Sequence, residues 1–368
     1  MRREIDGLTA LRGVAACWVV AYHMHQRDAV GGALGTLMRH GYLAVDVFFV
    51  LSGFVMALSY GTGFAGWRGF GVFLMRRFAR VYPLYFVTTL MALGLLLWLP
   101  HPALPWVWLP RMVVDNFLLV DAWGVGQALN GPSWSISTEL FAYLLFPLLV
   151  AMALGGTGGR GLAASLGAVL LGLAGVWLLA ALVPVPVGQT MNGPMDIWWP
   201  RSVWPLIRCL LEFTVGLATF GLFRAAAVAR WFSQGWVGGG LVAGVLVLAM
   251  LPGSDVAVVM LVPALLLALA AGRRPVPGLL VLLGQLSYGI YLLHGLVVQF
   301  RPQLADGFAA GLGPRAGDAA AVGTLYALIL GSAWLMYRFI ELPARVTIRG
   351  WEGRMFPAAP GRGKAARN

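Results

Sequence analysis

Arg12 and His23 share one apolar stretch of the sequence, residues 8–25, and both side chains can do chemistry. In a helix, this spacing places them about 20° apart around the axis and about 16 Å apart along it. A guanidinium binds anions, and an imidazole can accept a proton near neutral pH. The pair predicts a guanidinium near one side of the membrane and an imidazole near the other, both facing a protein interior or a water-filled cavity. The alternative is that Arg12 packs between helices and His23 lies at an interface.

Two carboxylates are expected at the same depth as His23. Asp46 lies in the apolar segment 41–54, and Glu139 comes just before another apolar run. A carboxylate beside an imidazole fixes its tautomer and stabilises its protonated form. Asp46 and Glu139 are therefore candidate catalytic groups together with His23, and Arg12 is counted with them as the second ionisable residue of the same helical stripe. For Asp46 the alternative is a favourable negative charge at a helix N-terminus.

Three arginines precede the apolar run 81–99. Arg76 and Arg80 are one helical turn apart, and Arg77 lies between them. Guanidinium groups bind phosphates through paired hydrogen bonds, so these side chains can clamp a nucleotide-like donor such as acyl-coenzyme A. The alternative is a basic anchor on the cytoplasmic side of a membrane segment.

Two further polar positions interrupt apolar runs. Ser135 lies four residues before Glu139, so the two side chains share one helical face. His294 lies well inside the run 284–300, where an ionisable residue is expensive and often functional. For His294 the alternative is a packing role between helices.

The composition places all these residues in a membrane protein. Of the 368 residues, 60% are hydrophobic and 11% are charged, and the mean hydropathy is +0.80. This is too apolar for a soluble domain, so we expect an all-α bundle of about ten transmembrane helices in the lipid bilayer. The expected spans are 8–25, 42–60, 81–99, 137–153, 162–183, 205–223, 237–252, 256–271, 284–300 and 320–341.

The basic residues predict the orientation of the bundle. With the N-terminus inside, 18 Lys and Arg residues fall on the cytoplasmic side and six outside, while Arg12 and Arg208 lie within spans. This bias predicts that both termini are cytoplasmic, in a cytoplasmic (inner) membrane protein. The net charge of +12 then reflects topology and not nucleic-acid binding. We expect a transmembrane domain over 1–342 and a basic, disordered cytoplasmic tail over 343–368.

Six motifs occur in one order and together resemble the integral-membrane acyltransferase 3 family, over residues 5–345. The motifs are Arg12-x10-His23, the segment 41–54, Arg76-Arg77-x-x-Arg80, Ser133-Trp134-Ser135-x-x-x-Glu139, Ser287-Tyr288-x-x-Tyr291-Leu292-x-His294 and Glu341-x-Pro343. The family includes O-acetyltransferases of O-antigen, exopolysaccharide and peptidoglycan, and acyltransferases of macrolide antibiotics.

The resemblance implies roles for these residues. Arg12 and His23 match the essential pair of the family, and the three arginines from Arg76 to Arg80 match its donor-coenzyme site. Many relatives append an extracytoplasmic hydrolase-like domain. Its lack in this sequence favours exopolysaccharide, lipid-linked sugar or small-molecule acylation over peptidoglycan acetylation. The candidate substrate-binding residues are Ser133, Trp134, Ser135, Tyr291 and His294.

The sequence therefore predicts a membrane O-acyltransferase. We expect it to move an acyl group, acetyl in the first instance, from cytoplasmic acyl-coenzyme A to a hydroxyl of a surface polysaccharide or lipid-linked glycan. The alternatives are a small-molecule acceptor such as a macrolide sugar, or a transporter without chemistry. Transporters often contain internal repeats, and none is evident here. No metal cofactor is expected, and Cys17 and Cys209 both fall inside apolar segments.

Overall fold

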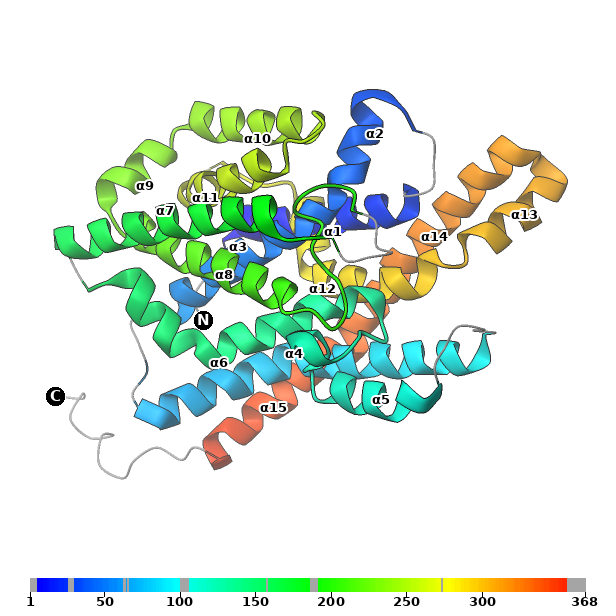
Figure 1. Cartoon of the computed structure of the whole chain (residues 1–368), viewed down its shortest axis with the longest axis horizontal. Helices are drawn as coiled ribbons and strands as arrows, with labels where there is room; N and C mark the ends of the chain where they lie inside the picture. The colour runs from blue at the N-terminus through cyan, green and yellow to red at the C-terminus, as the bar shows by residue number, and fades with distance from the viewer. Residues whose placement is uncertain are drawn as a thin grey trace.

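The computed structural model describes residues 5–25, 30–61, 64, 66–99, 106–156, 158–185, 191–272 and 274–355. Within these ranges the chain forms helices joined by turns and short loops, without a strand (Figure 1). The predicted all-α class is therefore confirmed. The longer helices are α1 (Asp6–His25), α3 (Ala44–Tyr60), α4 (Gly66–Trp98), α6 (Trp134–Leu154), α7 (Gly158–Leu182), α8 (Trp204–Phe223), α10 (Gly235–Ala249), α11 (Asp255–Ala271), α12 (Gly278–Val298), α13 (Arg301–Leu312), α14 (Pro314–Met336) and α15 (Leu342–Met355).

Each of the ten expected spans coincides largely with one of these helices. By length and composition, seven helical segments of the described chain can cross a membrane. The number is eight if α9 (Ala226–Phe232) and α10, which are bent by 69°, form one broken span. The shorter apolar helix α11 and the polar-interrupted α1 are outside that set. A multi-pass membrane protein is thus supported, whereas the number ten stays a prediction.

Two close helix pairs organise the interior. On α3 and α8, Gly53 and Gly216 each face the backbone of the opposite helix, and a methyl group at either position would overlap a carbonyl oxygen. Gly13 of α1 and Gly284 of α12 meet in the same way. Small residues allow helix backbones to approach closely in membranes, where dispersion contacts drive association. This packing holds α1 and α3, which carry predicted site residues, against α12 and α8.

The segment after residue 342 differs from our expectation. Instead of a disordered tail from 343 onward, the chain continues as α15, which lies along α4 (Figure 1). Arg345 pairs with Glu341 at the start of α15, and Glu352 accepts two hydrogen bonds from Arg76 of α4, at 2.8 and 2.6 Å. Ion pairs therefore order this polar helix, which lacks a strong apolar period. The remainder of the predicted tail, 356–368, lies outside the described residues.

A helical hairpin of α13 and α14 extends from one side of the bundle (Figure 1). Its tip turns at Gly313, whose φ of 78° suits glycine. At its base, Arg301 forms hydrogen bonds of 2.9 and 2.8 Å with the two carboxylate oxygens of Asp318. Arg301 also donates to the carbonyl oxygen of Met24. The hairpin is thereby fixed to the end of α1, one residue from His23.

Candidate active site

The imidazoles of His23 and His294 meet between α1 and α12. Their ring centroids are 5.0 Å apart, and the ring planes are inclined by 34°. His23 is half-buried, whereas His294 is fully buried, and neither ring nitrogen of His294 has a hydrogen-bond partner in the described part of the chain. An unsatisfied buried polar group costs about 1–3 kcal/mol. The buried nitrogens of His294 are therefore not held by a well-formed hydrogen bond within the described chain.

Tyr291 and Ser135 lie next to the two histidines. The ring of Tyr291 lies 5.7 Å from that of His294, and the hydroxyl oxygens of Tyr291 and Ser135 are 2.8 Å apart. Ser135 also donates to the carbonyl oxygen of Pro132, at 3.3 Å. The structure thus brings together three of the predicted substrate-binding residues, from α6 and α12, beside His23.

Glu139 lies one turn further along α6, away from the histidines. Its carboxylate accepts hydrogen bonds from the hydroxyls of Ser52 on α3 and Tyr143 on α6. The structure therefore places Glu139 with two hydroxyl groups and not with His23. A carboxylate held by two donors in a helix interior is satisfied without a cation.

Asp46 belongs to a buried ion pair that the sequence did not predict. Arg208 of α8 donates to both oxygens of Asp46, at 2.9 and 2.6 Å, and both side chains are almost fully buried. A second carboxylate, that of Glu212, lies 3.7 Å from Arg208. The structure thus joins Asp46 to a guanidinium and not to His23. The signal in the sequence was Arg208 itself, a charged residue inside an expected span.

The two other predicted substrate residues lie at the start of α6. The guanidinium carbon of Arg208 lies 5.9 Å from the ring centroid of Trp134. This contact links Trp134 to the buried Asp46–Arg208 ion pair. Ser133, just before Trp134, is fully buried. Trp134 therefore packs against the Asp46–Arg208 pair.

The three arginines of α4 are half-buried near α15 and the end of α3. Arg76 is paired with Glu352, as described above. The guanidinium of Arg77 lies 5.7 Å from the ring centroid of Tyr60, and its buried Nε has no hydrogen-bond partner among the described residues. Arg80 is close enough to Glu341 to interact with it electrostatically. The three side chains thus point to different partners around one end of α4.

Arg12 belongs to the same end of the bundle. Glu341 forms an ion pair with Arg345 and also interacts electrostatically with Arg80 and Arg12. Arg12 additionally donates to the hydroxyl of Thr9, at 3.4 Å. The predicted separation along α1 is therefore present: Arg12 lies with the arginines of α4, and His23 lies with His294.

A line of polar side chains connects these two ends. Ring contacts, hydrogen bonds and an electrostatic interaction join neighbouring members, except that Ser135 and Glu139 are related only by lying one helical turn apart on α6. The order is His23, His294, Tyr291, Ser135, Glu139, Tyr143 and Arg77. Sequence reasoning named most of these residues, but it missed Tyr143, since a tyrosine in an apolar run is ordinary.

A second buried network escaped the sequence analysis. Nδ1 of His40 lies 2.9 Å from the carbonyl oxygen of Ala249, and Nε2 lies 3.4 Å from Asp255. Tyr42 also donates to Asp255, at the first turn of α11. These contacts fasten the segment between α2 (Gly32–Arg39) and α3 to the turn between α10 and α11. The network reaches the histidine pair through Tyr22, whose ring centroid lies 5.6 Å from that of Tyr42 and 4.7 Å from that of His23.

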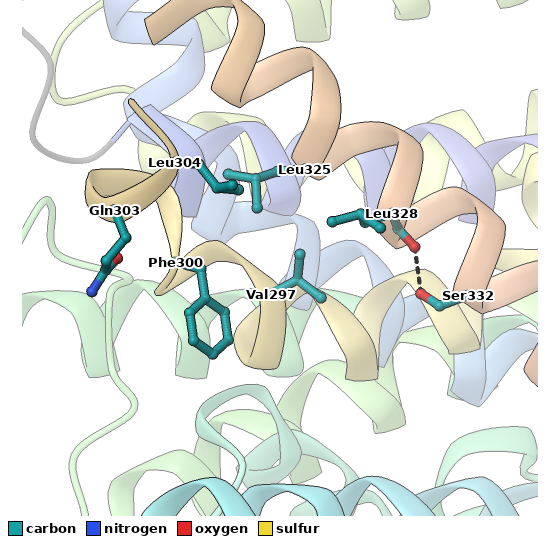
Figure 2. A pocket seen from close by; sticks show the side chains of 7 residues that line it. All are labelled: Val297, Phe300, Gln303, Leu304, Leu325, Leu328 and Ser332. Atoms are coloured by element: carbon teal, nitrogen blue, oxygen red, sulfur yellow. Dashed lines mark hydrogen bonds between the residues drawn. The ribbon is translucent and has the colours of Figure 1, made fainter. Parts of the chain in front are cut away.

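An apolar groove of about 490 Å³ lies between α12, α13 and α14 (Figure 2). Val297, one helical turn after His294, lines it together with Phe300, Leu304 and Leu325. The hydroxyl of Ser332 is turned to the carbonyl oxygen of Leu328, at 2.6 Å, so it adds little polarity. The groove is large and apolar enough to bind an apolar ligand close to the histidines.

Comparison with known proteins identifies the family of the chain. The profile of a family described as an acyltransferase domain matches residues 5–338, nearly the whole described helical region. The chain belongs to this acyltransferase family. It is 31% identical to Acyltransferase MdmB of Streptomyces mycarofaciens over 338 residues, which are 83% of this chain and 81% of that relative. This acyltransferase is therefore similar to its relative across the site and not in one motif alone.

Two other similarities of this acyltransferase are more partial. Protein 2 in picA locus of Rhizobium radiobacter is 47% identical over 79 residues, covering 21% of this chain and 38% of that protein. Nose resistant to fluoxetine protein 6 of Caenorhabditis elegans is 24% identical over 272 residues, covering 61% and 32%. No solved structure matches the chain significantly.

Proposed function

We propose that this membrane acyltransferase moves an acyl group, acetyl in the first instance, from acyl-coenzyme A to a hydroxyl of a surface polysaccharide or lipid-linked glycan. The donor binds on the cytoplasmic side of the inner membrane, where both termini lie. The observation that carries the proposal is the polar line from Arg77 to His23. It links a group suited to phosphate with a group suited to proton transfer, through the interior of the bundle.

Arg76, Arg77 and Arg80 hold the phosphates of the donor. Coenzyme A carries several phosphate oxygens, and guanidinium groups bind such oxygens through paired hydrogen bonds. The buried Nε of Arg77, which has no partner among the described residues, supports this role. Arg76 exchanges Glu352 for a phosphate when the donor binds. The arm of coenzyme A that carries the acyl thioester then extends along the polar line toward the histidines.

His23 acts as the general base. It removes the proton from the acceptor hydroxyl as the oxygen attacks the thioester carbonyl. The C–S bond then breaks, and the thiolate of coenzyme A takes the proton from the His23 imidazolium. Base catalysis of this kind contributes about 10²- to 10⁴-fold. His294, whose nitrogens have no partner in the described chain, donates an N–H to the developing oxyanion, a contact worth about 10²- to 10³-fold in known enzymes.

Transfer from radiolabelled acetyl-coenzyme A tests the proposal. Membrane vesicles that contain the protein are incubated with label on the acetyl group and, in parallel, on the coenzyme. We expect only the acetyl label to enter glycan, and mild alkali to release it as an ester. Movement of an intact solute across the vesicle without ester formation would instead support a transporter.

The apolar groove favours a second candidate acceptor, a small apolar molecule that carries a sugar, such as a macrolide. Its volume of about 490 Å³ falls within the usual range of small-molecule sites, about 300–1,000 Å³. Val297 places the groove one turn from His294. Under this alternative, a macrolide added to the vesicles gains one acetyl group by mass spectrometry. If the macrolide is the acceptor, the substitution Leu325→Trp, which fills the groove, abolishes that gain. If glycan is the acceptor, the same substitution leaves glycan labelling intact.

A further inference from the structure

A second cavity, of about 140 Å³, lies between α4, α12 and the loop before α6. Its lining includes Leu95 and Leu96 of α4, Asn130 of the loop, and Gly295 and Leu296 of α12. A water molecule occupies about 30 Å³ in the liquid, so the space accepts part of a sugar ring. The lining combines polar and apolar atoms, unlike that of the groove in Figure 2.

Asn130 lines this cavity, and its buried side-chain oxygen is unsatisfied. Its side chain is 1% exposed, and its amide nitrogen donates to the carbonyl oxygen of Leu292, at 2.8 Å. Because that carbonyl can only accept, the amide cannot be flipped, and Oδ1 is fixed as the free end. Oδ1 has no hydrogen-bond partner among the described residues. A methyl group added at Gly295, which also lines the cavity, would lie 3.0 Å from it.

Asn116, in the same region, is an asparagine whose side chain forms all its hydrogen bonds within the fold. Its amide nitrogen donates to the carbonyl oxygens of Met112 and Gln127, both at 2.8 Å. Its side-chain oxygen accepts from the backbone N–H of Leu129, also at 2.8 Å. Asn116 is therefore satisfied by the fold, whereas the oxygen of Asn130 needs a donor that the described chain does not supply.

The cavity adjoins the proposed active site. Leu292, which holds the amide of Asn130, and Gly295, which faces its oxygen, lie on either side of His294 in α12. Pro132, which packs on Gly295, leads into the turn that carries Ser135. A molecule in the cavity therefore lies beside the segment that contacts the histidine pair.

We propose that this cavity binds a sugar ring of the acceptor, with Oδ1 of Asn130 accepting a hydrogen bond from one of its hydroxyl groups. The inference rests on the proposed function and adds to the proposed active site a place where the acceptor binds. A neutral amide oxygen suits a hydroxyl donor, and the leucines suit the apolar face of a sugar ring. Asn130 is a binding residue in this account and takes no part in proton transfer.

The test uses the purified protein in liposomes, radiolabelled acetyl-coenzyme A, and a membrane extract of the source organism as acceptor. For Asn130→Ala we expect the extract concentration that gives half-maximal labelling to rise about tenfold, the effect of one lost hydrogen bond to a buried oxygen. The KM for acetyl-coenzyme A, and its slow hydrolysis without extract, stay within about twofold. A purely structural role would change all three together and would overturn the inference.

A matched pair of variants tests the cavity itself. Leu96→Phe fills the space, whereas Leu97→Phe adds the same ring at a neighbour that is 57% exposed. We expect Leu96→Phe to raise the extract concentration that gives half-maximal labelling, and Leu97→Phe to leave it unchanged. Equal behaviour of the pair, together with unchanged half-saturation in Asn130→Ala, would mean that the cavity holds only water.

Periodate, which cleaves vicinal diols of sugars, tests the ligand class. Periodate-treated extract is expected to lose its acceptor activity with the wild type, and full retention of that activity overturns the sugar assignment. If the wild type labels nothing in untreated extract, the proposed function itself fails, and this inference fails with it. Labelling by the wild type without any dependence on Asn130 overturns the inference alone.

Discussion

At the scale of single residues, the buried Asp46–Arg208 pair gives the carboxylate of Asp46 a structural role. Both side chains are removed from water, and both oxygens of Asp46 are used by Arg208. Desolvating two charges is expensive, and the attraction between them mainly offsets that cost. The pair therefore fixes α3 to α8 in one arrangement and leaves His23 without help from Asp46.

The substitution Asp46→Asn distinguishes this role from catalysis. It removes the carboxylate that binds Arg208 through both oxygens and leaves Glu212 at 3.7 Å, so we expect a loss of about 3 kcal/mol in stability, because the buried guanidinium loses its main partner. The measurement is the melting temperature in detergent, with kcat determined on the folded fraction. A normal melting temperature combined with a kcat about 100-fold lower would show that Asp46 acts on His23 after all.

Asp121, in the loop between α5 (Leu109–Phe117) and α6, gives a pH-dependent signature. Burial raises the pKa of Asp121 to about 7, and hydrogen bonds from the backbone, Ser137 and Tyr85 lower it only in part. The folded state therefore binds a proton more tightly than the unfolded state does. Its stabilising contribution is complete below the unfolded pKa, near 4, and is lost as the pH rises through about 7.

We therefore expect the melting temperature of the wild type, relative to that of Asp121→Asn, to fall between pH 4 and pH 7. The asparagine variant keeps a neutral side chain at every pH, so it serves as the reference. A constant difference across this range would show that Asp121 is ionised in the folded protein already at low pH.

At the scale of elements, Glu352 of α15 occupies the guanidinium of Arg76, to which the proposed function assigns a phosphate of the donor. Glu352 occupies Arg76 with the same two-oxygen geometry that a phosphate would use. The pair is partly exposed, so its contribution is about 1 kcal/mol or less. We expect Glu352→Gln to lower the KM for acetyl-coenzyme A by about two- to fivefold, and Glu352→Asp to leave it near the wild-type value. An increase in KM for the glutamine variant would mean that α15 assists donor binding.

The apolar runs predicted the positions of the long helices, because apolar length and period are local properties of the sequence, whereas the number of membrane spans stays a prediction. The ion-paired α15 and the hairpin of α13 and α14 were not predicted, since they depend on contacts between residues distant in the sequence. The same limit applied to the site. Arg12 and His23 were placed at two depths by helix geometry, but no period of one helix shows that His294 faces His23. Likewise, Arg208 was visible as a charge within a span, whereas its partner Asp46 was assigned to His23.

At the scale of the whole molecule, the bundle separates two kinds of chemistry. Cationic side chains gather at one end of α1 and α4, and imidazoles meet near the other end of α1 and α12. The polar line between them runs through α6, inside a protein whose outer surface is largely apolar. This division is consistent with the proposed function, in which the donor binds near the arginines and the acceptor near the imidazoles.

The most direct test of the account compares His23→Ala and Arg77→Gln in purified, reconstituted protein with labelled acetyl-coenzyme A and acceptor extract. We expect His23→Ala to lower kcat at least about 100-fold and to leave binding of acetyl-coenzyme A unchanged. Arg77→Gln is expected to raise the KM for the donor about tenfold and to retain most of kcat. Full turnover by a normally folded His23→Ala protein would contradict the central claim that this imidazole is the base.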